Sequence, residues 1–234
     1  MTTAKALLFD LDGTLVRTGG AGIRALNRSF QKLYNLDDPT AGMTIAGNMD
    51  PNIFREIVAQ KIPGKTLLPE EEKLIARHYL DYLKEEIQVS PKYSVLPGIR
   101  EILERTSSTP DLYVGLGTGN LEEGAKIKLE RGGLNPYFSF GGFGSDSDKR
   151  NKVLSIALER AEKKFKIKFD ASQVYVIGDT PRDIEAARTI GAKVLSVATG
   201  PYTIQDLQAL NPDLVLENLG IVEEFFSFVF KNGQ

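Results

Sequence analysis

Residues 7–14 read Leu-Leu-Phe-Asp-Leu-Asp-Gly-Thr, an apolar run that ends in two carboxylates one residue apart. An apolar run without polar alternation is typical of a central strand in a parallel sheet, where both faces of the strand are buried. Ligands bind such sheets beyond the carboxyl ends of the strands. We therefore expect a strand over residues 4–10 that places Asp10 at the mouth of a site, with Asp12 in the turn just beyond it.

The composition of the 234-residue chain is ordinary for a soluble globular protein, with 41% apolar residues, 26% charged residues and a net charge of −2. Acids and bases are interspersed, so we expect no basic surface for nucleic acid. The longest apolar stretches fall far short of the roughly 20 residues of a membrane helix, and the acids at 10 and 12 interrupt any signal-peptide core. The chain has no cysteine, which excludes disulfides and thiol chemistry. These features predict a cytoplasmic protein that binds neither nucleic acid nor membrane.

Strand-like apolar runs alternate with helical patterns over most of the chain. This alternation predicts an α/β fold, with a Rossmann-like parallel sheet and helices on both of its faces. Further strands are expected over residues 112–117, 137–143, 174–178, 193–198 and 213–216. Between residues 17 and 91 the periodicity is helical only. We therefore predict a small helical cap domain at 17–91, inserted after the first strand into an α/β core formed by 1–16 and 92–234.

Three of the expected strands end in a polar residue, namely Asp10, Thr118 and Asp179. Parallel strands bring these ends to one edge of the sheet, and Asp183 follows Asp179 at helical i, i+4 spacing. Two like charges about 4 Å apart cost about 4 kcal/mol at an effective dielectric constant of 20, so such a cluster needs a cation. A ligand set of oxygens alone favours Mg²⁺. The alternative is that Asp179 and Asp183 are only acids at the start of a helix.

The segments 10–14 (DLDGT), 118–120 (TGN) and 178–183 (GDTPRD) together resemble the haloacid dehalogenase-like (HAD) hydrolase superfamily. The resemblance is closest to its phosphoglycolate-phosphatase-like branch and extends over essentially the whole chain, including the helical cap. It implies a Mg²⁺-dependent phosphatase that hydrolyses a small phosphomonoester, of phosphoglycolate or sugar-phosphate type, through an aspartyl-phosphate intermediate. The dehalogenases lack the second acid, so Asp12 argues for phosphoryl chemistry.

The resemblance also implies roles for individual residues. Asp10 would attack phosphorus, while Asp12 would protonate the leaving alkoxide and later accept a proton from water. The implied Mg²⁺ ligands are three carboxylates and one backbone carbonyl: Asp10, Asp179, Asp183 and the carbonyl of Asp12. The implied phosphate-binding groups are a hydroxyl and two backbone N–H groups: Thr118, Gly119 and Asn120.

One motif departs from the family pattern. The family usually has Lys-Pro before the helix that is expected here to begin near Val153, but this chain has Asp-Lys-Arg-Asn-Lys at 148–152. A cation must bridge the phosphate and the nucleophile, and we favour Arg150 for this role, followed by Lys149 and then Lys152. Arginine can grip phosphate through two donors, with a geometry that differs from that of lysine. The alternative is a solvated charge run without a catalytic member.

The cap is expected to close over the site and to select the substrate. Candidate contacts are Arg17 and the loop 47–50, in which Asn48 and Asp50 offer polar side chains to the substrate. The alternative is that this loop only links two helices and that Asp50 caps the second of them. His78, the only histidine, is expected to be structural.

Other functions are compatible with the same motifs. A phosphoglucomutase-like phosphotransferase would keep the aspartyl-phosphate but exclude water, although relatives of that type often carry valine where this chain has Thr14. Pyrophosphatase or nucleotidase activity, or a catalytically silent phosphate-binding protein, are further alternatives. A non-enzymatic phosphate-receiving module is disfavoured because such modules are shorter and lack a cap. The expected partner is a small-molecule phosphate ester, and the expected state is a monomer or a homodimer.

Overall fold

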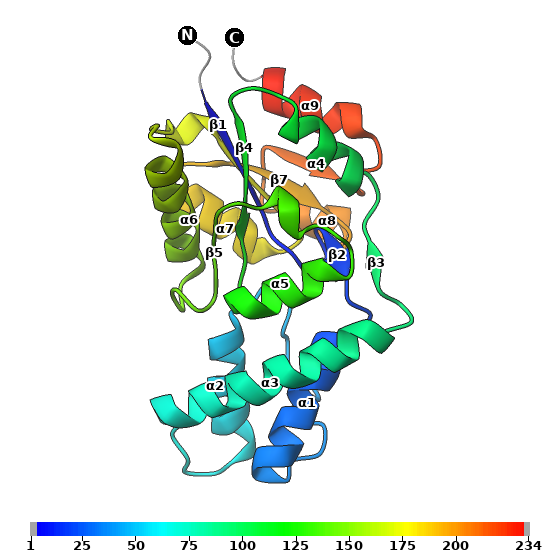
Figure 1. The fold of residues 1–234 in the computed structure, drawn as a ribbon, viewed down its shortest axis with the longest axis vertical. Coiled ribbons are helices and arrows are strands. Elements are labelled where there is room, and N and C mark those ends of the chain that lie inside the picture. The colour runs from blue at the N-terminus through cyan, green and yellow to red at the C-terminus, as the bar shows by residue number, and fades with distance from the viewer. Residues whose placement is uncertain (1–3, 232–234) are drawn as a thin grey trace.

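The computed structural model describes residues 4–231. Figure 1 shows two parts, a layered part that contains the main sheet and a smaller bundle of the helices α1, α2 and α3 beneath it. No helix within the described range is long and apolar enough to cross a membrane.

Six strands form one parallel sheet in the order β5-β4-β1-β6-β7-β8. In chain order these strands are β1 Lys5–Phe9, β4 Leu112–Gly117, β5 Gly141–Gly142, β6 Val174–Gly178, β7 Lys193–Val197 and β8 Leu214–Leu216. Strand β1 lies inside the sheet, and all five of its residues are buried. This arrangement confirms the predicted α/β fold with a parallel, Rossmann-like sheet.

Alternate residues of β1 face opposite sides of the sheet, and helices cover both sides. Leu7 and Phe9 belong to a hydrophobic cluster with α4, α5 and α9, and Ala6 and Leu8 belong to a second cluster with α6, α7 and α8. The bounds of these helices are α4 Ile99–Ser107, α5 Glu122–Glu130, α6 Arg150–Phe165, α7 Pro181–Thr189, α8 Ile204–Gln208 and α9 Val222–Lys231. A β1 strand buried from both faces explains why its sequence shows no polar alternation.

The helical bundle is inserted after β1 and has a hydrophobic cluster of its own. It consists of α1 Ala21–Tyr34, α2 Asp50–Lys61 and α3 Pro69–Val89. Strands β2 (Val16–Arg17) and β3 (Ser94–Val95) pair antiparallel where the chain enters and leaves the bundle. The bundle occupies the segment expected to form the cap, and the domain limits at 17 and 91 stay a prediction.

The strand expected over residues 137–143 is largely absent. The chain forms a 3₁₀ helix at Asn135–Tyr137 and only the two-residue strand β5. A Cβ on Gly142 would lie 2.0 Å from the carbonyl oxygen of Val153, so β5 ends where the start of α6 packs directly on its backbone. A second short 3₁₀ helix, Ala171–Gln173, precedes β6.

Candidate active site

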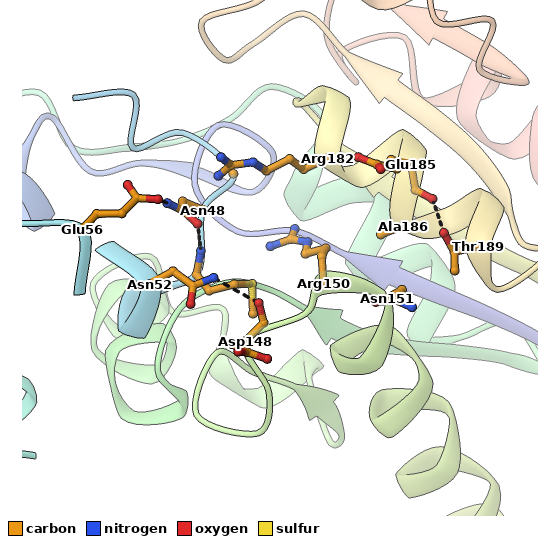
Figure 2. A pocket seen from close by; sticks show the side chains of 12 residues that line it. Asn48, Asn52, Glu56, Asp148, Arg150, Asn151, Arg182, Glu185, Ala186 and Thr189 are labelled. Atoms are coloured by element: carbon orange, nitrogen blue, oxygen red, sulfur yellow. Dashed lines mark hydrogen bonds between the residues drawn. The ribbon is translucent and has the colours of Figure 1, made fainter. Parts of the chain in front are cut away.

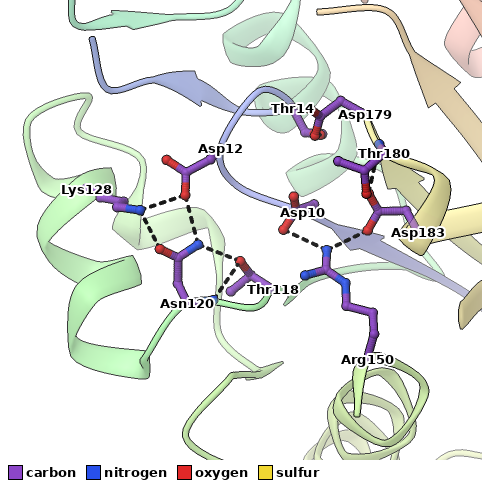
Figure 3. Close-up of polar contacts among 10 residues, drawn as sticks. All are labelled: Asp10, Asp12, Thr14, Thr118, Asn120, Lys128, Arg150, Asp179, Thr180 and Asp183. Atoms are coloured by element: carbon purple, nitrogen blue, oxygen red, sulfur yellow. Dashed lines mark hydrogen bonds and ion pairs between the residues drawn. The ribbon is translucent and has the colours of Figure 1, made fainter. Parts of the chain in front are cut away.

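The sheet topology brings three polar residues to one edge. Strand β1 pairs with both β4 and β6, so the ends of these strands lie next to each other. Asp10, Thr118 and Asp179 follow the three strands and are all buried. Figure 3 shows them at the edge of the sheet, together with side chains that α5, α6 and α7 contribute.

Asp10, Asp179 and Asp183 form a buried acidic cluster. Each offers a carboxylate oxygen, and these oxygens lie within 4.8 Å of one another. Burial and the charge of Asp183 raise the pKa of Asp10, although Arg150 opposes the shift. Burial and the charges of Asp10 and Asp183 raise the pKa of Asp179 well above its ordinary value. The cluster therefore carries more negative charge than its protein surroundings balance.

Asp183 has two roles in the structure. Its Oδ2 accepts hydrogen bonds from the backbone N–H of Thr180 at 3.1 Å and from the Thr180 hydroxyl at 2.7 Å, which caps the start of α7. Its Oδ1 faces the acidic cluster, where it contacts Arg150. Asp183 therefore caps the start of α7 and also belongs to the acidic cluster.

Arg150 is the basic residue that reaches the cluster. Its Nη2 lies 2.8 Å from Oδ1 of Asp10 and 2.5 Å from Oδ1 of Asp183, and its side chain is 8% exposed. Helix α6 begins at Arg150 and not near Val153, so this arginine belongs to the first helical turn. Lys149 and Lys152, the other two candidates, are exposed.

The acidic cluster fits a divalent cation. Its three carboxylates carry three negative charges and Arg150 carries one positive charge, so two negative charges are left when all are ionised. The donors are all oxygens, which suits Mg²⁺ or a similar hard cation. Glycine backbone packs closely on Asp179, because a Cβ on Gly13 or Gly200 would lie 2.4 Å or 1.7 Å from its Oδ2. These glycines hold the carboxylate against the loop that follows β1.

On the other side of Asp10, a hydrogen-bonded network surrounds Asp12. Lys128 of α5 lies 2.6 Å from Oδ2 of Asp12 and donates to Oδ1 of Asn120 at 2.5 Å. The Asn120 amide donates to Oδ2 of Asp12 at 2.9 Å and to the Thr118 hydroxyl at 2.8 Å. Burial opposes the charge on Lys128, but Asp12, Tyr79 and Asp50 outweigh it and raise the pKa of Lys128.

Lys128 was not among the residues predicted from the sequence. Its position on the helix could have revealed it. Ala125 lies three residues before Lys128 and Leu129 one residue after it, and both are buried in the core. A lysine between such positions is itself buried, with 4% of its surface exposed. Charged side chains are almost never fully buried unless they are paired, so a lysine on an apolar helix face predicts a polar partner.

The loop 47–50 lies directly over the segment that follows β4. A Cβ on Gly119 would lie 2.4 Å from the carbonyl oxygen of Asn48. The backbone N–H of Asp50 donates to the carbonyl oxygen of Gly119 at 2.8 Å, and Oδ2 of Asp50 accepts from the backbone N–H of Leu121 at 2.9 Å. Asp50 thus contacts the start of core helix α5 and not the start of its own helix, so the capping alternative was wrong. Burial raises the pKa of Asp50 to about 6.

A cavity of about 480 Å³ lies between the bundle and the core beside Arg150. Figure 2 shows polar side chains from both parts around it: Asn48, Asn52 and Glu56 from the bundle side, and Arg150, Arg182 and Glu185 from the core. The side chain of Asn48 donates to Glu56 at 3.2 Å. Arg17 donates instead to the backbone oxygen of Thr199 at 3.0 Å, and His78 stacks on Tyr82 within α3.

Comparison with known proteins adds independent evidence. The family model described as haloacid dehalogenase-like hydrolase matches residues 7–197. A phosphoglycolate phosphatase from Synechococcus elongatus is 25% identical over 214 residues, which cover 91% of this chain and 92% of that protein. Another phosphoglycolate phosphatase, from Agrobacterium fabrum, is 29% identical and covers 90% of this chain and 87% of its own.

Solved structures show the same fold. The crystal structure of β-phosphoglucomutase from Clostridium difficile superposes with a TM-score of 0.72 at 17% sequence identity, with 98% of each chain covered. At this level of identity the similarity concerns the fold, and the chemistry has to be argued from the side chains at the sheet edge.

Proposed function

Because this chain belongs to the haloacid dehalogenase-like hydrolase family, we propose that it is a divalent-cation-dependent phosphatase that acts on small phosphomonoesters through Asp10. The observation that carries the proposal is the juxtaposition of Asp10 with a buried acidic cluster on one side and with Asp12 and Thr118 on the other. Its curated relatives include phosphoglycolate phosphatases, which suggests an ester of phosphoglycolate or sugar-phosphate type.

In the first step of this mechanism, a carboxylate oxygen of Asp10 attacks phosphorus in line with the leaving group. The new O–P bond forms as the bond from phosphorus to the alkoxide oxygen breaks. Asp12 in its acid form gives its proton to that oxygen, so the alcohol leaves neutral and Asp12 becomes a carboxylate. The product on the protein is an acyl phosphate at Asp10.

In the second step, water attacks phosphorus and Asp12 takes the proton that the water gives up. The bond between phosphorus and the Asp10 oxygen breaks, which releases inorganic phosphate and regenerates the Asp10 carboxylate. The acid and base roles of Asp12 balance over the cycle. Thr118 and the backbone N–H groups of Gly119 and Asn120 would hold the phosphate oxygens during both steps.

A bound Mg²⁺ would be held by Asp10, Asp179, Asp183 and the backbone carbonyl of Asp12, and would offset the negative charge that a carboxylate and a phosphate bring together. Arg150, at the start of α6, contributes a positive charge beside Asp10. We assign to Arg150 the role of the lysine that the family usually provides. The cavity lined by Asn48 and Arg182 would hold the leaving group or provide the path by which the substrate enters.

The test is phosphate release from a panel that contains 2-phosphoglycolate, sugar phosphates, a nucleotide, pyrophosphate and p-nitrophenyl phosphate. Each is measured with Mg²⁺ and with chelator, for the wild type and for Asp10→Asn. We expect Mg²⁺-dependent release that the variant abolishes, and the ranking across the panel identifies the substrate class. No release from any compound would overturn the proposal, and phosphoryl transfer between sugar phosphates would then be measured. The predictions of a cytoplasmic protein and of a monomer or homodimer need separate experiments.

A further inference from the structure

The ammonium of Lys128 sits where three elements meet. It hydrogen-bonds to Asp12, in the turn after β1, and to Asn120, in the loop before α5, and it interacts electrostatically with Tyr79, on α3 of the helical bundle. A Cβ on Gly22 would lie 3.6 Å from the lysine nitrogen and 3.7 Å from the Tyr79 hydroxyl, so both groups pack against the start of α1. One side chain therefore joins the proposed acid and the proposed phosphate-binding loop, and it lies next to the helical bundle.

Two donors of Lys128 are used by the protein itself. An ammonium has three N–H donors and no acceptor. Asp12 and Asn120 accept two of them, and the lysine side chain is only 5% exposed. This placement argues against Lys128 as a group that binds phosphate or the leaving group directly.

The network also determines how Asp12 is held. Lys128 and Asn120 both donate to the same oxygen, Oδ2, at 2.6 Å and 2.9 Å. Two donors that converge on one carboxylate oxygen fix the plane of the carboxylate, and the other oxygen, Oδ1, lies outside this pair of bonds. The Asp12 side chain is 41% exposed, so without these donors its carboxylate would be free to rotate.

Resting on the proposed function, we propose that Lys128 is a positioning residue that orients Asp12 for proton transfer to the leaving group, with Tyr79 of the helical bundle placed beside the same ammonium. An exposed acid on a turn populates several rotamers, and proton transfer requires hydrogen-bond reach and alignment. Lys128 restricts Asp12 to one orientation while Asn120 ties the same oxygen to the phosphate loop.

The test uses leaving groups that differ in their need for an acid. An alkoxide needs a proton as it leaves, whereas p-nitrophenolate is a stable leaving group without one. We compare kcat/KM, which reports the steps up to alcohol release, for 2-phosphoglycolate or the best alkyl ester and for p-nitrophenyl phosphate. Lys128→Met is expected to lower kcat/KM for the alkyl ester by about 10–100-fold, the range seen for groups that orient a catalytic side chain, and to lower it for the aryl ester by less than about 5-fold.

Matched variants separate positioning from a structural role. Lys126→Met removes an exposed lysine from the same helix, where it pairs with Glu122 at 2.7 Å, and should leave both substrates unaffected. Tyr79→Phe should show the same selectivity for the alkyl ester with a loss of only about 2–10-fold, because it removes one polar group beside the ammonium and leaves the bonds to Asp12 and Asn120 in place. In an Asp12→Asn background, Lys128→Met should cost little more, because the two residues act as one unit.

The outcomes are distinct. Equal losses for the alkyl and aryl esters, or no loss for either, would overturn the role of Lys128 while leaving the phosphatase intact. No phosphate release by the wild type from any ester would overturn the proposed function, and the assignment of Lys128 with it. If Lys128→Met does not fold, Lys128→Gln retains a hydrogen-bond donor without the charge. It should show the same selectivity at a smaller amplitude, and equal losses would again overturn the assignment.

Discussion

Two basic side chains reach the carboxylates after β1 from opposite sides, and their surroundings differ. Arg150 contacts two buried acids, Asp10 and Asp183, with a third acid nearby. Lys128 contacts one acid, Asp12, whose side chain is 41% exposed, together with neutral polar groups. The Arg150 side therefore has an excess of negative charge, while on the Lys128 side one ammonium faces one carboxylate and the neutral side chain of Asn120.

This contrast separates two ways in which a protein holds charge in a partly buried site. The acidic side has an excess of negative charge that a divalent cation would balance, so under the proposed function its stability and its chemistry depend on binding. On the Lys128 side the chain itself supplies the donors that hold Asp12, and they are in place before substrate arrives, which favours proton transfer. Four measurements of the free energy of unfolding can break or sharpen this comparison.

The largest effect is expected for Arg150→Met. This change leaves Asp10 and Asp183 buried without the positive charge of the Arg150 guanidinium. Removal of one partner of a buried ion pair typically costs about 3–5 kcal/mol. Urea denaturation at neutral pH in the presence of chelator measures the loss. Lys163→Met, an exposed position on the same helix, should change the free energy of unfolding by no more than about 0.5 kcal/mol. A loss as small as that of the control would show that Arg150 does not balance the acidic cluster.

The second effect concerns Asp50, which joins the helical bundle to the start of α5. Burial raises the pKa of Asp50 from 3.8 to about 6, so the folded state resists its ionisation. The stability that the protonated carboxyl contributes is fully present below about pH 4 and is lost as the pH rises through about 6, by about 3 kcal/mol for a shift of this size. Asp50→Asn keeps an acceptor for the Leu121 N–H but cannot ionise.

The measurement for Asp50 is the difference in unfolding free energy between Asp50→Asn and the wild type at a series of pH values. All other acids are common to both proteins, so the difference isolates this carboxyl. We expect the variant to gain about 3 kcal/mol relative to the wild type between pH 4 and pH 7. A difference that is independent of pH would show that the contact of Asp50 with α5 does not desolvate its carboxyl.

The third effect is stabilisation by Mg²⁺. A ligand at a concentration of 100 times its dissociation constant stabilises the folded state by about 2.7 kcal/mol. We expect such a gain for the wild type and almost none for Asp179→Asn, which loses one carboxylate of the cluster. In chelator we expect Asp179→Asn to be more stable than the wild type, because the substitution removes an acid whose pKa is raised by burial and by the charges of Asp10 and Asp183. Equal stabilisation of both proteins would place the cation elsewhere.

The sequence predicted those parts of the molecule that depend on local patterns. Apolar runs that end in acids located β1, β4 and β6 and therefore the edge where Asp10, Thr118 and Asp179 meet. Arg150 was predicted because it lies in the chain segment where a family motif was missing. Its ion pairs with two acids could be seen only once α6 was found to start at this residue.

The contacts that escaped prediction join elements that are distant in the sequence. Lys128 and Asp12 are 116 residues apart in the sequence, and Asp50 and Leu121 are 71 apart. No local pattern reports such contacts, because helical periodicity places a side chain on a face without naming what packs against that face. The shortness of β5 has the same origin, since the backbone of α6 occupies the space next to Gly142.

The smallest effect is expected for Lys128→Met, even though Lys128 is more deeply buried than Asp12. Water can reach the partly exposed Asp12 once the ammonium is gone, and a methionine of similar length removes the cost of burying a charge. What remains is the loss of the hydrogen bond to Asn120 and of the electrostatic interaction with Tyr79, so we expect a destabilisation of no more than about 1–2 kcal/mol. Urea denaturation of Lys128→Met, measured in parallel with Arg150→Met and Lys126→Met, compares the losses in unfolding free energy directly. A small loss keeps the variant folded, so that a selective fall in alkyl-ester hydrolysis reports on Asp12. A loss as large as that of Arg150→Met would instead make Lys128 a structural ion-pair partner, and the two sides of the site would then hold charge in the same way.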